Sequence, residues 1–140
     1  MFISGTIQIT TAKVIWITGT NPNATISISG NTATLTLSVV NGTAQNFTTC
    51  LYLKNLAARA YTINFTTTTT LSTSYFSTAK VLVYDNASLV SSVTTLDMTT
   101  TTPSNGNSLS AGEVYSLVFD IATTPSATGS YSFAVKATYQ

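Results

Sequence analysis

The sequence contains no histidine, one cysteine and few charged side chains in 140 residues. Histidine is the commonest general base, so its absence excludes Ser-His-Asp and Cys-His catalysis and most zinc and copper sites. A single cysteine excludes an intrachain disulfide. Cys50 lies in the strand-like stretch "FTTCLYL", a pattern that predicts a small buried apolar side chain.

Carboxylates are equally scarce, since the chain has only Asp85, Asp97, Glu113 and Asp120. Glycoside hydrolysis needs two carboxyl groups about 5–10 Å apart, and a calcium site needs several clustered oxygen ligands. The sequence does not indicate which of the four come together, and it has no glycine-rich phosphate-binding motif. We therefore expect a protein that is not an enzyme and that uses no metal or cofactor.

Charged residues form 6% of the chain and leave a net charge of +1, whereas about a quarter of an ordinary soluble domain is charged. The five basic residues are scattered, so no nucleic-acid partner is expected. No apolar run approaches the roughly 20 residues of a membrane helix, so no membrane span is expected. A near-neutral surface gives little repulsion between copies, which favours self-assembly.

Threonine and serine, by contrast, make up about a third of the chain. Threonine is β-branched and polar, so it suits strands with one wet face. The opening "MFISGTIQIT" alternates apolar and polar residues, as does the final "GSYSFAVKATYQ". The stretch "TAKVIWITG" is apolar on both faces and predicts a central, covered strand. Gly30 and Asn31 separate two alternating runs and predict a hairpin.

About ten such segments follow one another at 8–14 residue spacing, with no sustained helical period. This pattern predicts an all-β protein, a single antiparallel β-sandwich of jelly-roll or immunoglobulin-like type. Its aromatic residues mostly alternate with polar ones, which favours core packing over a sugar-binding platform.

Five N-x-[ST] sequons are candidate N-glycosylation sites. Asn23, Asn41 and Asn86 fall in predicted turns and are the better candidates. An N-glycan there would add hydrophilicity that the few charged residues do not supply. The candidates are Asn23, Asn41, Asn46, Asn64 and Asn86.

Two stretches carry a family resemblance. The first, "TLTLSVVNGTAQNFTTCLYLKNLAARAYTINFT", resembles the part of extracellular sandwich domains where a strand ending in "L-K-N" precedes a short loop. The second, "LSAGEVYSLVFDIATTPSATGSYSFAVKATYQ", resembles their ending, with an "L-x-A-G" turn and a final "G-x-Y-x-F" strand. Together they are similar to archaeal bundling-pilus and thread subunits and to bacterial biofilm fibre proteins of the TasA/camelysin type, over roughly half of the chain.

The resemblance implies an extracellular, cell-surface filament, a pilus-like structural protein of archaeal type that serves adhesion or biofilm formation. Such subunits polymerise head-to-tail with identical subunits by donor-strand exchange, in which an N-terminal strand enters a groove of the next subunit. Carried over, residues 1–10 are the donor strand and residues 11–140 the β-sandwich domain. The implied interface residues are Phe2, Ile3, Gly5, Ile7 and Ile9, and the last strand, 130–139, is expected to flank the groove.

Two other classes remain open. The opening strand could pair within its own sandwich, giving a monomeric cell-surface or carbohydrate-binding module, which an exposed aromatic stripe would favour. A viral coat or tail jelly roll would instead form closed symmetric assemblies.

Overall fold

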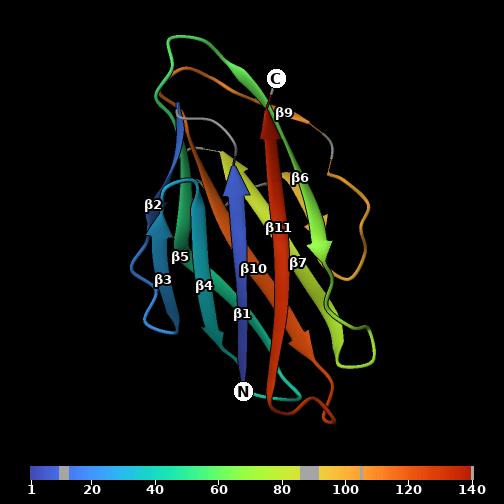
Figure 1. The fold of residues 1–140 in the computed structure, drawn as a ribbon. Helices are drawn as coiled ribbons and strands as arrows, with labels where there is room; N and C mark the ends of the chain where they lie inside the picture. Colours follow the sequence, from blue (N-terminus) through green and yellow to red (C-terminus); the bar gives the residue numbers. More distant parts are fainter. Residues whose placement is uncertain (10–12, 86–91, 105, 140) are drawn as a thin grey trace.

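A computed structural model describes residues 1–9, 13–85, 92–104 and 106–139. The described residues form strands and connecting segments, arranged in two sheets that enclose one core (Figure 1). The all-β fold expected from the sequence is confirmed, with two mostly antiparallel sheets. The strands are β1 Phe2–Ile9, β2 Val14–Thr18, β3 Ala24–Ser29, β4 Thr32–Ser38, β5 Ala44–Asn55, β6 Tyr61–Thr69, β7 Phe76–Asp85, β8 Ser92–Asp97, β9 Asn107–Leu109, β10 Val114–Thr123 and β11 Ser130–Tyr139.

The six-stranded sheet has the order β3-β4-β1-β11-β6-β9, and the five-stranded sheet has the order β2-β5-β10-β7-β8. Period-two alternation builds the core, because every second side chain of a strand faces the opposite sheet. On β4, for example, Ala33, Leu35 and Leu37 are fully buried. The described residues include no helix with the length and apolar character that a membrane span requires.

β1 departs from the antiparallel pattern predicted from the sequence. It pairs antiparallel with β4 on one side but parallel with β11 on the other, with Phe2 opposite Ser130 and Ile9 opposite Ala137. The other strand pairs in the described part of the chain are antiparallel. β1 therefore lies inside the sheet, between β4 and β11, the last strand of the chain (Figure 1).

Some local predictions are confirmed and one is wrong. β3 and β4 form the predicted hairpin, with Ser29 opposite Thr32 and Gly30 at a φ of 56°, as a turn with glycine in its first central position requires. The stretch containing β2 is not a central strand. β2 is an edge strand of the five-stranded sheet, and its outward Ile15 and Ile17 are each 37% exposed.

β5 is irregular where it meets the end of β2. Thr49 has a φ of 53°, a left-handed conformation that β-branched residues rarely adopt. This conformation turns the Thr49 carbonyl toward the segment after β2, where it accepts hydrogen bonds from the N–H groups of Thr20 (2.7 Å) and Asn21 (3.2 Å). The Gly19 N–H donates to the Cys50 carbonyl at 2.7 Å. Cys50 is buried, as predicted, and burial raises the pKa of its thiol to about 11.

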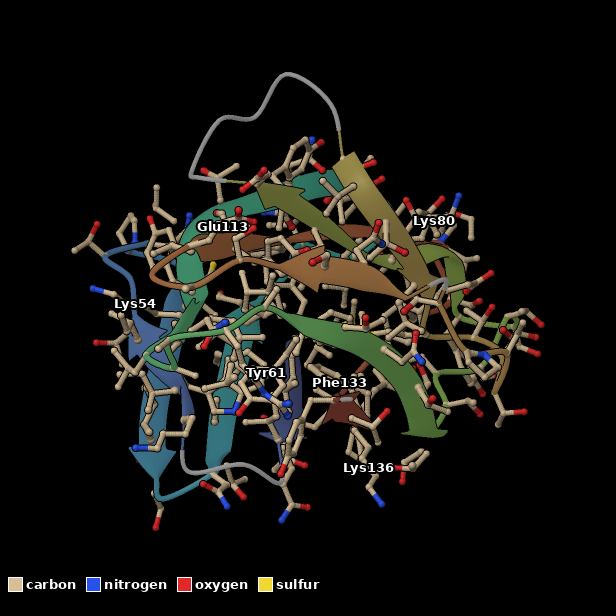
Figure 2. All side chains as sticks on the ribbon, turned by 90° about the horizontal axis from the view of Figure 1, so that it is seen from above. Lys54, Tyr61, Lys80, Glu113, Phe133 and Lys136 are labelled. Carbon is tan, nitrogen blue, oxygen red and sulfur yellow. The ribbon has the colours of Figure 1, made fainter. Side chains whose placement is uncertain are left out.

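The outer face of the six-stranded sheet is covered with hydroxyl groups. Outward residues of β4 lie opposite those of β1 in register, and the hydroxyls of Ser4 and Thr36 are 3.1 Å apart. Lys136 of β11 also points away from the sandwich, whereas Phe133 lies between the two layers (Figure 2). The outward hydroxyl residues of β1 and β4 are Ser4, Thr6, Thr32, Thr34, Thr36 and Ser38.

Candidate assembly site

β1 fills the position between β4 and β11 in the six-stranded sheet, and we call this position the β1 slot. Inside it, Ile3, Ile7 and Ile9 have no exposed surface. Each has an inward-facing residue of β11 beside it, since Ile3 pairs with Tyr131 and Ile7 with Val135. The structure therefore brings together the three isoleucines that the sequence singled out, and it places β11 beside them.

Gly5 is the position in the slot where the backbone of β1 lies against an aromatic ring. It lies opposite Leu35 of β4 and Phe133 of β11, and the Phe133 ring extends over it. A Cβ atom added to Gly5 would come within 2.4 Å of Phe133 Cε2 and Cζ. Phe133 is itself 3% exposed and packs on Phe119, with ring centroids 6.2 Å apart. The absence of a side chain at position 5 therefore makes room for the ring.

Both ends of β1 are anchored by the backbone. At one end, Met1 and Val39 exchange hydrogen bonds, with Val39 N–H donating to the Met1 carbonyl at 3.0 Å. At the other end, the Ile9 N–H donates to the Asn31 carbonyl at 3.0 Å, and Trp16 Nε1 donates to the same oxygen at 2.9 Å. Sequence reasoning missed β4 and Asn31 as parts of this site, because alternation shows which face is buried but does not reveal the strand partner.

Phe2 differs from the other predicted interface residues. It precedes the first inward isoleucine by one position, so its side chain faces outward and is 52% exposed. It lines an open hollow of about 440 Å³ at the Met1 end of β1. Among the described aromatic residues, the exposed ones are Phe2 and Tyr75, and Tyr75 packs on Tyr131 at 5.1 Å. Two such side chains do not form the aromatic stripe that would favour a sugar-binding face.

The sequons differ in accessibility. Asn23, Asn41 and Asn46 are exposed. Asn64 is half-buried, and its Oδ1 is buried with no hydrogen-bond partner in the described structure. A Cβ added to Gly106 would lie 2.7 Å from this oxygen, so Gly106 covers the amide. Asn64 is therefore a poor glycan acceptor in the folded chain, and Asn86 lies outside the described residues.

Two of the four carboxylates come together, which the sequence did not reveal. Asp85 lies close enough to Glu113 to act on its carboxyl group through a hydrogen bond and its negative charge. Burial, together with the hydrogen bond and the negative charge of Asp85, raises the pKa of Glu113. Burial and the charges of Glu113 and Asp85 also raise the pKa of Tyr115 to about 12, and its hydroxyl donates to the Ser108 carbonyl at 2.8 Å. Among the described residues, no group of three or more acidic, histidine or cysteine side chains could hold a metal ion.

This contact predicts a stability that increases on mild acidification. A raised pKa in the folded state means that the native protein holds the Glu113 proton more tightly than the unfolded chain. The stabilisation is complete below the pKa of Glu113 in the unfolded chain, about 4.3, and is lost as the pH rises through its pKa in the folded protein.

We therefore expect Glu113→Gln to raise the melting temperature at pH 7 slightly, on the order of 1 °C, because the pair is largely solvated. The wild type should gain relative to this variant as the pH falls toward 5, and thermal melts at pH 5, 6 and 7 measure both. An unchanged difference across this range would contradict the coupling.

Comparison with known proteins adds no family assignment. No protein-family model matches the sequence, and no curated protein matches it.

Proposed function

We propose that this chain is the structural subunit of an extracellular filament and that it polymerises by inserting β1 into the β1 slot of the next subunit. The observation that carries the proposal is the place of β1: it precedes every other strand of the sandwich in the sequence, yet it lies in the interior of a sheet. Such a strand can leave its sheet without pulling another strand with it. The remaining sandwich then has two unpaired strand edges, on β4 and β11, facing one groove.

An identical strand from a second copy satisfies this groove completely. Backbone hydrogen bonds supply affinity in strand addition, and side-chain pockets supply register. The pockets here are specific, because three isoleucines and a glycine must meet their partners in a fixed order, and a shift by one residue would turn all of them outward. Burial of the three isoleucines contributes about 5–9 kcal/mol before the costs of association.

Exchange must compete with the strand's insertion into its own sandwich, the arrangement described above. The tethered strand has a high effective concentration, so exchange is favoured only where subunits are concentrated or where further contacts between subunits add to it. The scarcity of charge supports such contacts, since 6% charged residues give little repulsion between copies. Each such contact joins the strand of one copy to the slot of another, so contacts that do not close into a ring propagate as an open filament.

The proposal also includes the type of sandwich and the location and role of the filament. The sandwich belongs to the jelly-roll or immunoglobulin-like group, and the filament lies at the cell surface and serves adhesion or biofilm formation. Glycans on the exposed Asn23, Asn41 and Asn46 would hydrate its surface.

The test compares the full chain with a variant lacking residues 1–10, by size-exclusion chromatography and negative-stain microscopy. We expect the full chain to form fibres at high concentration and the truncated chain to stay unassembled. A synthetic peptide "FISGTIQIT" should bind the truncated chain and restore its thermal stability, whereas a scrambled peptide of the same composition should not. A full chain that stays monomeric at every concentration, and that truncation merely unfolds, would overturn the proposal.

That second outcome describes the alternative, a monomeric cell-surface or carbohydrate-binding module. The observation that favours it is the pairing of β1 with β4 and β11 of its own chain. Sugar binding by the monomer would support it further.

A further inference from the structure

The connection between β1 and the rest of the chain limits how two copies can meet. Three residues separate Ile9, the last residue of β1, from Lys13, which precedes β2. Four Cα–Cα steps span at most about 14 Å. Wherever β1 is inserted, the Lys13 of the same chain must therefore lie within this distance of the mouth of the slot that holds Ile9.

Lys13 belongs to the same end of the molecule as that mouth. Its carbonyl accepts a hydrogen bond of 2.7 Å from the Leu56 N–H, and Val14 lies opposite Asn55 at the end of β5. The loop after β5 lies at the end of the sandwich toward which β1 points (Figure 1). Since the acceptor's own Lys13 is also within about 14 Å of its slot mouth, the two Lys13 residues in an exchanged pair are within about 30 Å of each other. The longest strand, β5, has 12 residues and spans about 40 Å. The short connection therefore brings like ends of the two copies together.

An apolar side chain is exposed at this end. The side chain of Leu56 is 52% exposed, while its own backbone N–H donates the hydrogen bond to the Lys13 carbonyl. Its loop is held rigidly, because the buried Asn55 side chain donates to the carbonyls of Arg59 (2.8 Å) and Leu109 (3.0 Å) and accepts from the Ala57 N–H (2.8 Å). Arg59 in turn lies over the Tyr61 ring at 4.6 Å. A preformed loop presents Leu56 at low entropic cost.

We propose that the loop carrying Leu56, residues 56–59, is the second contact of the assembly, packing against the like end of the neighbouring copy beside the mouth of its β1 slot. This inference rests on the proposed strand exchange, and it commits to one occupant, a second copy of this chain. It also supplies the additional contact that exchange needs in order to compete with insertion of β1 into its own sandwich.

The test uses Leu56→Asp in the full chain, with Val40→Asp as the matched control. Val40 is 60% exposed and lies at the opposite end, next to Val39, which pairs with Met1. Since both side chains are exposed, neither substitution should change the melting temperature of the monomer by much. We expect Leu56→Asp to raise the concentration needed for assembly about tenfold or more, and Val40→Asp to change it less than threefold. Sedimentation velocity measures both.

A second measurement does not depend on the folding of the aspartate variants. In a Cys50→Ala background, single cysteines at Ala58 or Asn41 accept a donor or an acceptor dye, and the two labelled preparations are mixed and assembled. Energy transfer between copies should be stronger from position 58 than from position 41. If wild-type chains assemble through β1 but Leu56→Asp assembles equally well, or position 41 gives the stronger transfer, this inference is wrong and the strand exchange stands. If wild-type chains do not assemble at all, both are wrong.

Discussion

Substitution of Gly5 by valine is expected to lower the free energy of unfolding by about 2–3 kcal/mol, although the new side chain is apolar and the site is buried. The reason is the Phe133 ring, whose Cε2, Cζ and Cδ2 atoms would lie within 2.5 Å of the added Cβ. The ring cannot simply turn aside, because it is buried against Phe119. Denaturant unfolding measures the loss. The peptide "FISGTIQIT" carrying the same substitution should fail to rescue the truncated chain.

A double-mutant cycle isolates this contact. Phe133→Ala alone should destabilise the chain by about 3–5 kcal/mol, since it leaves a cavity in the core. In the double variant the valine side chain enters that cavity. The loss of unfolding free energy in the double variant should therefore be about 1–2 kcal/mol smaller than the sum of the two single losses. Strictly additive costs would show that the ring and position 5 do not compete for the same space.

Gly19→Ala adds one methyl group, and we expect it to lower the free energy of unfolding by about 3 kcal/mol or more, the largest effect of any such addition. A Cβ at this position would lie 1.8 Å from the Thr49 carbonyl oxygen and 2.4 Å from its carbon. Backbone cannot swing away as a side chain can, so the substitution must separate the end of β2 from β5. The three hydrogen bonds that Gly19, Thr20 and Asn21 donate to the carbonyls of β5 would be lost or weakened.

Thr20→Ala is the matched control for this prediction. Its side chain is exposed and its N–H is retained, so the change should stay within about 0.5 kcal/mol. Equal effects of the two substitutions in thermal or denaturant unfolding would contradict the proposed clash. The site was not predictable from the sequence, because nothing in "ITGTN" or "FTTCL" indicates that the two stretches touch.

The sequence predicted best what depends on neighbouring residues. Alternation in β1 identified Ile3, Ile7 and Ile9 as buried, and Gly30 identified the hairpin. The prediction for β2 was wrong. Ile15 and Ile17 make its second face apolar, as in a strand covered on both faces, but β2 is an edge strand and both side chains are exposed. Alternation records how apolar a face is, whereas the number of strands that cover it depends on distant parts of the chain.

The candidate site shows the same division. The buried face of β1 could be predicted from ten residues, but its parallel pairing with β11 and the fit of Gly5 to Phe133 join positions more than a hundred residues apart. The contact between Asp85 and Glu113 was missed for the same reason. The three-residue β9, within a stretch that reads as a long polar loop, was missed because it is too short to show a period.

The parallel pairing of β1 with β11 also imposes an order on synthesis. β1 leaves the ribosome before the other strands of the sandwich, but one of its two neighbours follows only after the rest of the sandwich has been made. Contacts between residues so far apart in the chain form slowly. During that interval the first strand is available, paired at most with β4 along one edge. The nascent chain therefore carries β1 with at most one of its two strand neighbours until β11 has been made. In the proposed strand exchange, this interval is when a second copy made close by would take up β1.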